Sequence, residues 1–409
     1  MERKKNRLPA GGFVPVALSL PAALSLLAAL SLLTAPSLKA APLVSTTWGF
    51  KIDLPEGYTF TGGDGKNRFS FNSDAGGTFD LVVYPGGTYP SVELLARETK
   101  KRLNARGDIS SFNYRNKNAA LMRIRFSPGG GSREAYEGWG LCIELEAPAD
   151  NPRAKPLLLA LAYGGTGSGR EGGGLEEFHL SALDSIAPTN ADRRAPGPVT
   201  EFTWPRGNRL PVTLAGNVTG AFIQEHDAEA AQALVDREFT ILKRYLDSPL
   251  RDEAWIRFYR TIYRDSFERL IEAAFALERI WYVAEGPEGQ TRQFAATALK
   301  WVQTFTYERD LLGSDFVNLV SAVTEGRGDC DSRAMLWAIL LEQANIPAAI
   351  MVSREYSHAM GLADIAGDGA RFTAGNKRWL VAETTAAVDI GLIGEKSADP
   401  AKWLGVIFE

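Results

Sequence analysis

The sequence predicts an α+β protein with a β-rich N-terminal region, a helix-rich middle and a mixed C-terminal region. Three observations lead to this prediction. Runs within 48–186 alternate apolar and polar residues, as strands with one buried face do. Residues 227–305 place apolar side chains three or four apart, which is the spacing of one helix face. After residue 325, a short glycine-rich turn leads into an apolar helix, and β-rich runs follow it.

The composition is that of an ordinary globular protein and limits the partners to expect. The chain has 409 residues, of which 23% are charged and 45% are hydrophobic, and its net charge is −4. This length favours two or three domains. A nucleic-acid partner is not expected, because the sequence shows no basic face. The three histidines are scattered, so neither a metal site nor a cofactor is predicted.

Residues 1–40 have the pattern of an export signal. A positive stretch at 1–7 precedes an uncharged apolar run at 13–33, and small residues within 37–41 offer a cleavage site. The apolar run approaches the roughly 20 residues that span a bilayer, so an uncleaved membrane anchor is the alternative. Pro15 and Pro21 disfavour a spanning helix. The rest of the chain is expected to be periplasmic or secreted, and to contact a membrane only if this segment is retained.

Residues 41–187 form the predicted N-terminal α+β domain, with an antiparallel sheet. The expected strands are 48–54, 78–84, 121–126, 136–146 and 157–163. Ser91 is the expected N-cap of a helix that reaches about residue 103, and a second helix with an apolar stripe covers 175–186. The opening Trp-x-Phe-x-Ile-x-Leu-Pro-x-Gly-Tyr pattern and the closing helix loosely resemble the PsbP-like α/β sandwich.

The chain has two cysteines, Cys142 and Cys330. In an exported protein, two cysteines first suggest one disulfide. These two fall in different predicted domains, however, which disfavours a bridge between them. Cys142 lies in an alternating apolar run and is expected to be a strand residue without a chemical role.

The middle of the chain is predicted to be a linker followed by a helical segment. Residues 188–200 are polar, proline-rich and without large apolar side chains, which is typical of a linker. In the helical segment, 201–285, Asp227 can cap one helix, and a longer helix covers 252–282. The aromatic and aliphatic stripe of the longer helix is expected to be core and not a ligand site. The C-terminal domain is assigned to 286–409.

Cys330 is the predicted nucleophile of an active site in the C-terminal domain. Gly326 and Gly328 indicate a tight turn, and Asp329 is a natural N-cap for the apolar helix that follows. Unpaired N–H groups and the helix dipole at this end favour a thiolate, the reactive form of cysteine. Asp329 and Asp331 oppose the thiolate, so a cationic partner is required. A buried structural cysteine that only begins a core helix is the alternative.

His358 is the expected base, and Glu383 is its expected carboxylate partner. The runs at 358–363 and 378–384 are predicted to form an antiparallel pair joined by the polar loop 364–376. The first residue of one strand then faces the last of the other, which places the two Cβ atoms ~5 Å apart. A carboxylate bound to imidazole fixes its tautomer and supports its positive charge, so a thiolate–imidazolium pair is expected. An ordinary surface histidine is the alternative for His358.

These residues resemble the bacterial transglutaminase-like domain over about 290–390. The similar motifs are Trp301-Val302-Gln303-x-x-x-Tyr307, Gly326-Arg327-Gly328-Asp329-Cys330, His358-Ala359 and Trp379-Leu380-Val381-Ala382-Glu383-Thr384-Thr385. The resemblance implies a papain-like fold, in which the cysteine begins a helix packed on an antiparallel sheet that supplies the histidine and the acid. The chain departs from the family at Glu383, where aspartate followed by Pro-Thr is usual, and at Met360, where an aromatic residue often stands.

The predicted function is that of an exported transglutaminase-like cysteine enzyme that acts on protein or peptide amides. An acyl-thioester would form on Cys330 of the triad Cys330, His358 and Glu383. Its transfer to water makes a cysteine protease or amidase, which is favoured, and its transfer to an amine makes a protein-glutamine acyltransferase. The Cys330 N–H is an expected oxyanion donor, with Gln303 and Tyr307 as candidate side-chain donors. The alternative is a catalytically inactive cell-envelope binding or scaffold protein.

Overall fold

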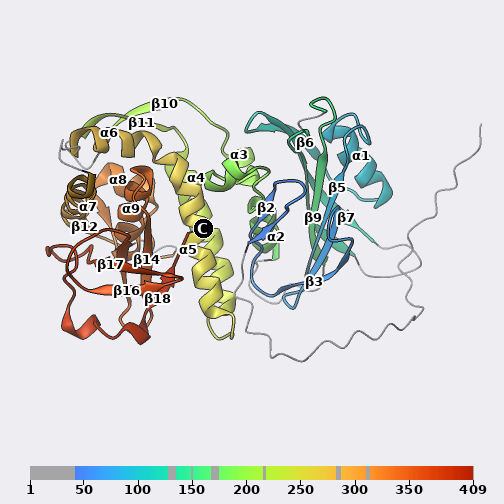
Figure 1. Ribbon diagram of the computed structural model, residues 1–409. Coiled ribbons are helices and arrows are strands. Elements are labelled where there is room, and N and C mark those ends of the chain that lie inside the picture. The colour runs from blue at the N-terminus through green and yellow to red at the C-terminus, as the bar shows by residue number, and fades with distance from the viewer. Residues whose placement is uncertain are drawn as a thin grey trace, which may run out of the picture. The chain divides into compact units, whose positions relative to one another are not determined.

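The computed structural model describes residues 42–127, 135–148, 151–166, 175–214, 218–281, 287–309 and 314–408. Helices and sheets are both abundant in these ranges, which confirms the α+β prediction (Figure 1). Residues 40–409 form one compact unit, separate from 1–39. The predicted export signal lies outside the described residues. In the part of the chain that the structure describes, no helix is long and apolar enough to cross a bilayer.

A seven-stranded antiparallel sheet dominates the N-terminal region, in the order β3-β4-β5-β9-β8-β7-β6. Its strands are β3 (Tyr58–Gly63), β4 (Arg68–Ser73), β5 (Gly77–Tyr84), β6 (Ile109–Tyr114), β7 (Lys117–Phe126), β8 (Tyr136–Glu144) and β9 (Leu157–Gly165). A small pair, β1 (Leu43–Val44) and β2 (Lys51–Ile52), precedes it. Both faces of the sheet contribute to hydrophobic clusters, one with α1 (Val92–Arg102) and the other with α2 (Leu175–Asp184).

Two sequence predictions for this region are confirmed. Ser91 caps α1, because its side chain accepts a hydrogen bond from the Leu94 N–H at 3.2 Å. Cys142 is fully buried in β8, and both Cys142 and Cys330 are free thiols.

The segment 188–200 is an ordered and buried connection, in contrast to the linker expected there. It contains the 3₁₀ helix η1 (Asn190–Arg194) and the start of α3 (Pro198–Thr203). The buried carboxylate of Asp184 accepts hydrogen bonds from the N–H groups of Val199 (2.9 Å) and Thr200 (3.0 Å). A Cβ on Gly197 would lie 2.0 Å from an Asp184 carboxylate oxygen. The small residues here therefore reflect close packing on Asp184 rather than exposure to solvent.

Helices fill the middle of the chain, as predicted. They are α4 (Asp227–Leu242), η2 (Lys243–Tyr245), α5 (Arg251–Arg269), α6 (Ile271–Trp281) and α7 (Pro287–Gln303), and the hairpin of β10 (Arg209–Leu214) and β11 (Val218–Gln224) precedes them. The single helix expected over 252–282 is in fact two, α5 and α6, which meet at Leu270. The end of α5 is held by the Gln343 side chain, which donates to the Phe267 carbonyl at 2.6 Å. Asp227 is the first residue of α4 and accepts from the Gln224 N–H at 2.8 Å.

A buried charge network joins the N-terminal region to α4 and α5. Arg257 of α5 is almost fully buried and donates to Glu238 of α4 at 2.7 Å. It also donates to the Asp53 backbone carbonyl at 3.1 Å and to the Ser181 hydroxyl. Every charge in this network has partners, as buried charges require.

Glu56 lies beside this network and should make stability depend on pH. Burial raises the pKa of Glu56 to about 7, with Arg257 acting in the opposite direction. A raised carboxyl pKa contributes stability that is fully present below the ordinary value of 4.5 and is lost as pH rises through about 7. The effect of Glu56→Gln on the free energy of unfolding should therefore be more stabilising at pH 8 than at pH 4.5, by ~2–3 kcal/mol. Urea titrations at the two pH values measure this effect. Glu395→Gln, at an exposed position, should leave the free energy of unfolding unchanged at both pH values.

A five-stranded sheet and a buried helix form the C-terminal region (orange to red in Figure 1). The strand order is β16-β17-β15-β14-β18, and all neighbouring pairs are antiparallel. The elements are β12 (Thr306–Tyr307), α8 (Leu319–Glu325), β13 (Arg327–Gly328), α9 (Cys330–Gln343), β14 (Ala348–Ser353), β15 (His358–Ala363), β16 (Arg371–Ala374), β17 (Lys377–Ala382), η3 (Glu395–Ser397), η4 (Pro400–Lys402) and β18 (Leu404–Val406).

Helix α9 packs against β14 and β15 and is buried on nearly all sides, which explains its lack of a polar face. Its Trp337 is fully buried and donates to the Ala295 carbonyl at 3.0 Å. The Trp337 ring covers Gly361 of β15 so closely that a Cβ there would lie 2.4 Å from the ring. This contact sets the distance between α9 and the strand that carries His358.

Candidate active site

Cys330 is the first residue of α9, as predicted. Gly326, with φ of 67°, ends α8 in the left-handed conformation that glycine favours. Asp329 then caps α9 through hydrogen bonds from the Ser332 N–H (2.8 Å) and hydroxyl (2.6 Å). Cys330 is buried, and the backbone N–H of Ala359 acts to lower the pKa of its thiol. Helix α9 packs against β15, and Cys330 and His358 line the same cavity.

The side chains of His358 and Glu383 are hydrogen-bonded to each other. His358 Nε2 lies 2.8 Å from Glu383 Oε2. The other carboxylate oxygen of Glu383 accepts from the Thr385 N–H at 2.8 Å and from the Thr385 hydroxyl at 2.6 Å. Burial acts to raise the pKa of Glu383, but the bonds from His358 and Thr385 outweigh it and leave the pKa lowered. An ionised carboxylate on Nε2 leaves Nδ1 as the imidazole nitrogen available to a thiol.

The strand register differs from the one predicted. β15 pairs with β17 through Gly361↔Ala382, Leu362↔Val381 and Ala363↔Leu380. Continuing that register places Met360 opposite Glu383 and His358 opposite Thr385, two residues away from the expected pairing. The reason is that the supposed loop 364–376 contains β16, which forms a hairpin with β17. His358 and Glu383 are therefore diagonal neighbours on one face, and long side chains span such a diagonal.

The environment of Cys330 raises the pKa of its thiol and so opposes the thiolate, and the expected thiolate–imidazolium pair stays a prediction. Burial raises the pKa of Cys330, and the carboxylates of Asp331 and Asp329 raise it further. Asp331 Oδ1 lies 3.5 Å from the sulfur, and its Oδ2 accepts from the Tyr259 hydroxyl at 2.7 Å. The same crowding raises the pKa of Asp329 to about 7, through burial and then through Asp331. Desolvation and two neighbouring carboxylates thus outweigh the favourable end of α9.

Asp331→Asn should make Cys330 more reactive. The amide keeps the size of the side chain and an acceptor for Tyr259, but it removes the nearest negative charge. Because the pKa of the thiol is raised, the thiolate is the minor form, and each unit by which the pKa falls gives about ten times more of it. We expect iodoacetamide to alkylate Cys330 about tenfold faster at pH 8. Asp315→Asn, which removes an exposed charge of the same cavity, is the matched control, and an equal acceleration there would contradict the assignment to Asp331.

The two candidate side-chain oxyanion donors have different surroundings. Gln303 Nε2 donates to the backbone carbonyls of Glu383 (2.8 Å) and Val388 (2.9 Å). Both of its donor hydrogens are therefore engaged in holding the loop that carries Glu383, which corrects the expected role for Gln303. Tyr307 is 52% exposed, and β12 pairs with β13 directly before Cys330. Its role as a donor stays a prediction.

A cavity of about 340 Å³ contains Cys330 and His358. Its other lining residues are Phe239, Leu242, Leu246, Trp255, Phe258, Tyr259, Arg309, Ser314, Asp315, Phe316, Asp329, Asp331, Val352, Ser353, Arg354 and Ser357. The sequence does not predict that residues of α4, α5 and the turn between them belong to the site. For the helix over 252–282 it predicts an apolar stripe in the core, because spacing along a helix cannot distinguish a buried face from the wall of a cavity.

The residues best placed to hold a metal ion are at the same site. Among the described residues, Asp329, Cys330 and Asp331 offer ligand atoms that lie within 4.8 Å of one another. The Asp329 carboxylate is already bound by Ser332 and that of Asp331 by Tyr259. The absence of a metal from the chemistry stays a prediction.

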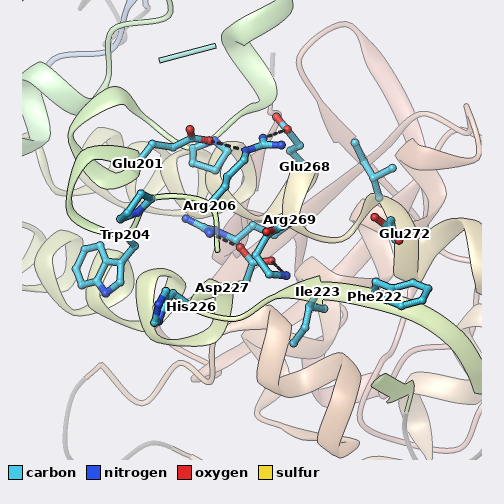
Figure 2. Close-up of a pocket in the computed structure, with 14 residues that line it drawn as sticks. Glu201, Trp204, Arg206, Phe222, Ile223, His226, Asp227, Glu268, Arg269 and Glu272 are labelled. Carbon is cyan, nitrogen blue, oxygen red and sulfur yellow. Dashed lines mark hydrogen bonds and ion pairs between the residues drawn. The ribbon is translucent and has the colours of Figure 1, made fainter. Parts of the chain in front are cut away.

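A second cavity, of about 220 Å³, lies between α3, β11 and the junction of α5 and α6 (Figure 2). Figure 2 shows its charged side chains turned toward one another: Arg269 binds Asp227 at 2.5 Å, and Arg206 binds Glu268. The two other carboxylates of the lining also have partners, since Glu201 lies near Arg115 and Arg206, and Glu272 binds Arg209. Because every carboxylate of the lining is paired with an arginine, the second cavity suggests no particular ligand.

Known proteins add little to this description. No family model and no curated protein matches the chain. The solution structure of cyanobacterial PsbP from Synechocystis is similar over 30% of this chain and 78% of its own, with 10% identity and a TM-score of 0.23. A crystal structure of a protein from Bacteroides thetaiotaomicron is similar over 55% of this chain and 78% of its own, with 12% identity and a TM-score of 0.24. Similarities this low support no conclusion about fold or function.

Proposed function

We propose that this chain is an exported transglutaminase-like cysteine enzyme that cleaves protein or peptide amides, with Cys330 as nucleophile, His358 as base and Glu383 as its partner. One observation carries the proposal: His358, whose imidazole is hydrogen-bonded to Glu383 at 2.8 Å, lines the same cavity as Cys330. A nucleophile, a base and an orienting acid in this order form the general arrangement for acyl transfer.

Because the pKa of the thiol is raised, we propose that the first step begins from the thiol. The sulfur bonds to the carbonyl carbon of the substrate while its proton passes to His358 Nδ1, so attack and proton transfer are coupled. The Cys330 N–H is placed to stabilise the oxyanion of the tetrahedral intermediate. When the C–N bond breaks, His358 returns the proton to the leaving amine and an acyl-thioester remains. His358 then takes a proton from water, whose oxygen bonds to the acyl carbon while the C–S bond breaks. The acid is released, and His358 gives its proton to the departing sulfur, which restores the thiol and the neutral imidazole.

The surrounding fold supports the same proposal. Cys330 begins a buried helix that packs against an antiparallel sheet, and that sheet carries His358, with Glu383 directly after β17. This is the arrangement that the resemblance to the transglutaminase-like domain implies. Glu383 stands where the transglutaminase-like domain usually has aspartate, and its carboxylate still reaches His358 from a diagonal position.

The test is turnover of a peptide library with and without a fluorescent primary amine, comparing wild type with Cys330→Ala. We expect the wild type to release free acids, which defines a protease or amidase. Incorporation of the amine in their place would define an acyltransferase. The proposal fails if neither product forms, or if Cys330→Ala turns over as the wild type does.

An inactive cell-envelope binding or scaffold protein is the second candidate. The observation that favours it is the burial of the thiol beside two carboxylates, which raises its pKa. In that case Cys330→Ala would leave every cellular phenotype of the wild type unchanged.

A further inference from the structure

We propose that the helical wall of the catalytic cavity binds a bulky apolar side chain of the peptide substrate, close to the amide that Cys330 attacks. The helical wall consists of Phe239, Leu242, Leu246, Trp255 and Phe258, from α4, α5 and the turn between them. The position of the amide rests on the proposed function. The binding of the side chain does not.

The cavity has two walls of different chemistry. The helical wall is aliphatic and aromatic and carries no charge. A second group of lining residues comes from the end of β14 and the turn into β15: Val352, Ser353, Arg354, Ser357 and His358. Cys330, at the start of α9, lines the same cavity. A peptide bound at Cys330 therefore has both groups within the cavity that receives its neighbouring side chains.

The helical wall leaves apolar surface uncovered. Leu246 is 40% exposed, and Phe239 and Trp255 are only half-buried. Scattered apolar residues on a surface need no explanation, but here they line one concave surface shared with a nucleophile. Covering them with an apolar group removes their surface from water, which favours binding in proportion to the area buried.

The charged residues of the cavity lie outside the helical wall. Arg309 is near Asp315, at 3.9 Å, Asp331 is bound by Tyr259, and Arg354 belongs to the turn into β15. A volume of about 340 Å³ is at the lower end of ligand sites, so it suits one large side chain with its backbone. We therefore assign the helical wall to leucine, phenylalanine or tryptophan of the substrate, in preference to small or acidic residues.

Binding to full-length Cys330→Ala tests the inference without turnover. The probes are blocked fluorescent heptapeptides of glycine, serine and glutamine in which one residue beside a glutamine is Phe, Leu, Ala or Glu. We expect the Phe and Leu peptides to bind about tenfold more tightly than the Ala peptide by fluorescence anisotropy. Adding Leu246→Ala should remove most of that preference, and Leu246→Phe should weaken the Phe peptide by filling the site.

Leu250→Ala is the matched control, since Leu250 is 37% exposed, lies four residues further on and does not line the cavity. With Leu250→Ala added, the preference for the Phe and Leu peptides over the Ala peptide should equal that of Cys330→Ala alone. Equal binding of all four peptides, no binding of any, or an equal loss with Leu250→Ala would overturn the inference.

A turnover arm separates this inference from the proposed function. In the background that retains Cys330, Leu246→Ala should raise KM for the Phe peptide about tenfold with little change in kcat, because the contact is the same in substrate and transition state. Selective binding without turnover would contradict the proposed enzyme function and support the apolar binding site. Turnover without a preference for apolar side chains would support the enzyme function and contradict the apolar binding site.

Discussion

Glu383→Gln should lower kcat for amide turnover by about 10³-fold and leave KM nearly unchanged. The structure explains why so conservative a change has so large an effect. The Thr385 N–H and hydroxyl both donate to Glu383 Oε1, so in the variant they hold the amide oxygen at that position. The amide NH₂ then occupies the position of Oε2 and faces His358 Nε2.

An amide donor at Nε2 forces the neutral imidazole to carry its proton on Nδ1. That tautomer cannot accept the thiol proton, and the imidazolium formed during the reaction loses its counter-charge. Steady-state kinetics on a cleaved peptide measure the effect. Glu355→Gln, on the exposed turn before His358, is the control and should retain full activity. If Glu383→Gln kept more than a tenth of the wild-type kcat, the carboxylate would have no part in the reaction.

Arg257→Met should lower the free energy of unfolding by about 3–5 kcal/mol. Methionine fills much of the space but leaves Glu238 buried without its 2.7 Å partner. Glu238 keeps Arg237 at 2.9 Å and Ser181 at 3.1 Å, which places the expected loss toward the lower end of that range. Chemical denaturation at pH 7 measures the change.

Two further variants identify the cause of that loss. Arg260→Met removes a bidentate ion pair with Asp53 that is partly open to solvent, so it should cost only about 1 kcal/mol. Arg257→Met combined with Glu238→Gln should be more stable than Arg257→Met alone, because the uncompensated charge is gone. A double variant less stable than the single one would show that packing of Arg257, and not its charge, dominates.

The network around Arg257 also concerns the site. Arg257 precedes Phe258, which lines the cavity that contains Cys330, and Glu238 precedes Phe239 on α4. The ion pair therefore joins the two helices at the place where they form the helical wall. Its loss should disturb substrate binding as well as stability.

Several features of the fold and the site were predictable from the sequence because they depend on neighbouring residues. The N-caps at Ser91 and Asp329, the alternation of the N-terminal strands and the glycine turn before Cys330 are of this kind. The pairing of His358 with Glu383 was also expected, although the register on which it was based is shifted by the β16 hairpin. The hydrogen bond between His358 and Glu383 forms because a glutamate side chain is long enough to span diagonal positions on the two strands.

Other features were decided only by the tertiary structure. The sequence by itself determined where the helix of Cys330 begins, because capping and turn formation are local. The tertiary structure decided that Gln303 supports the loop of Glu383, that the helical wall completes the cavity, and that the pKa of Cys330 is raised. Burial and Coulomb interactions sum over segments far apart in the chain, such as Tyr259, Asp331 and Ala359, so no local pattern reports them.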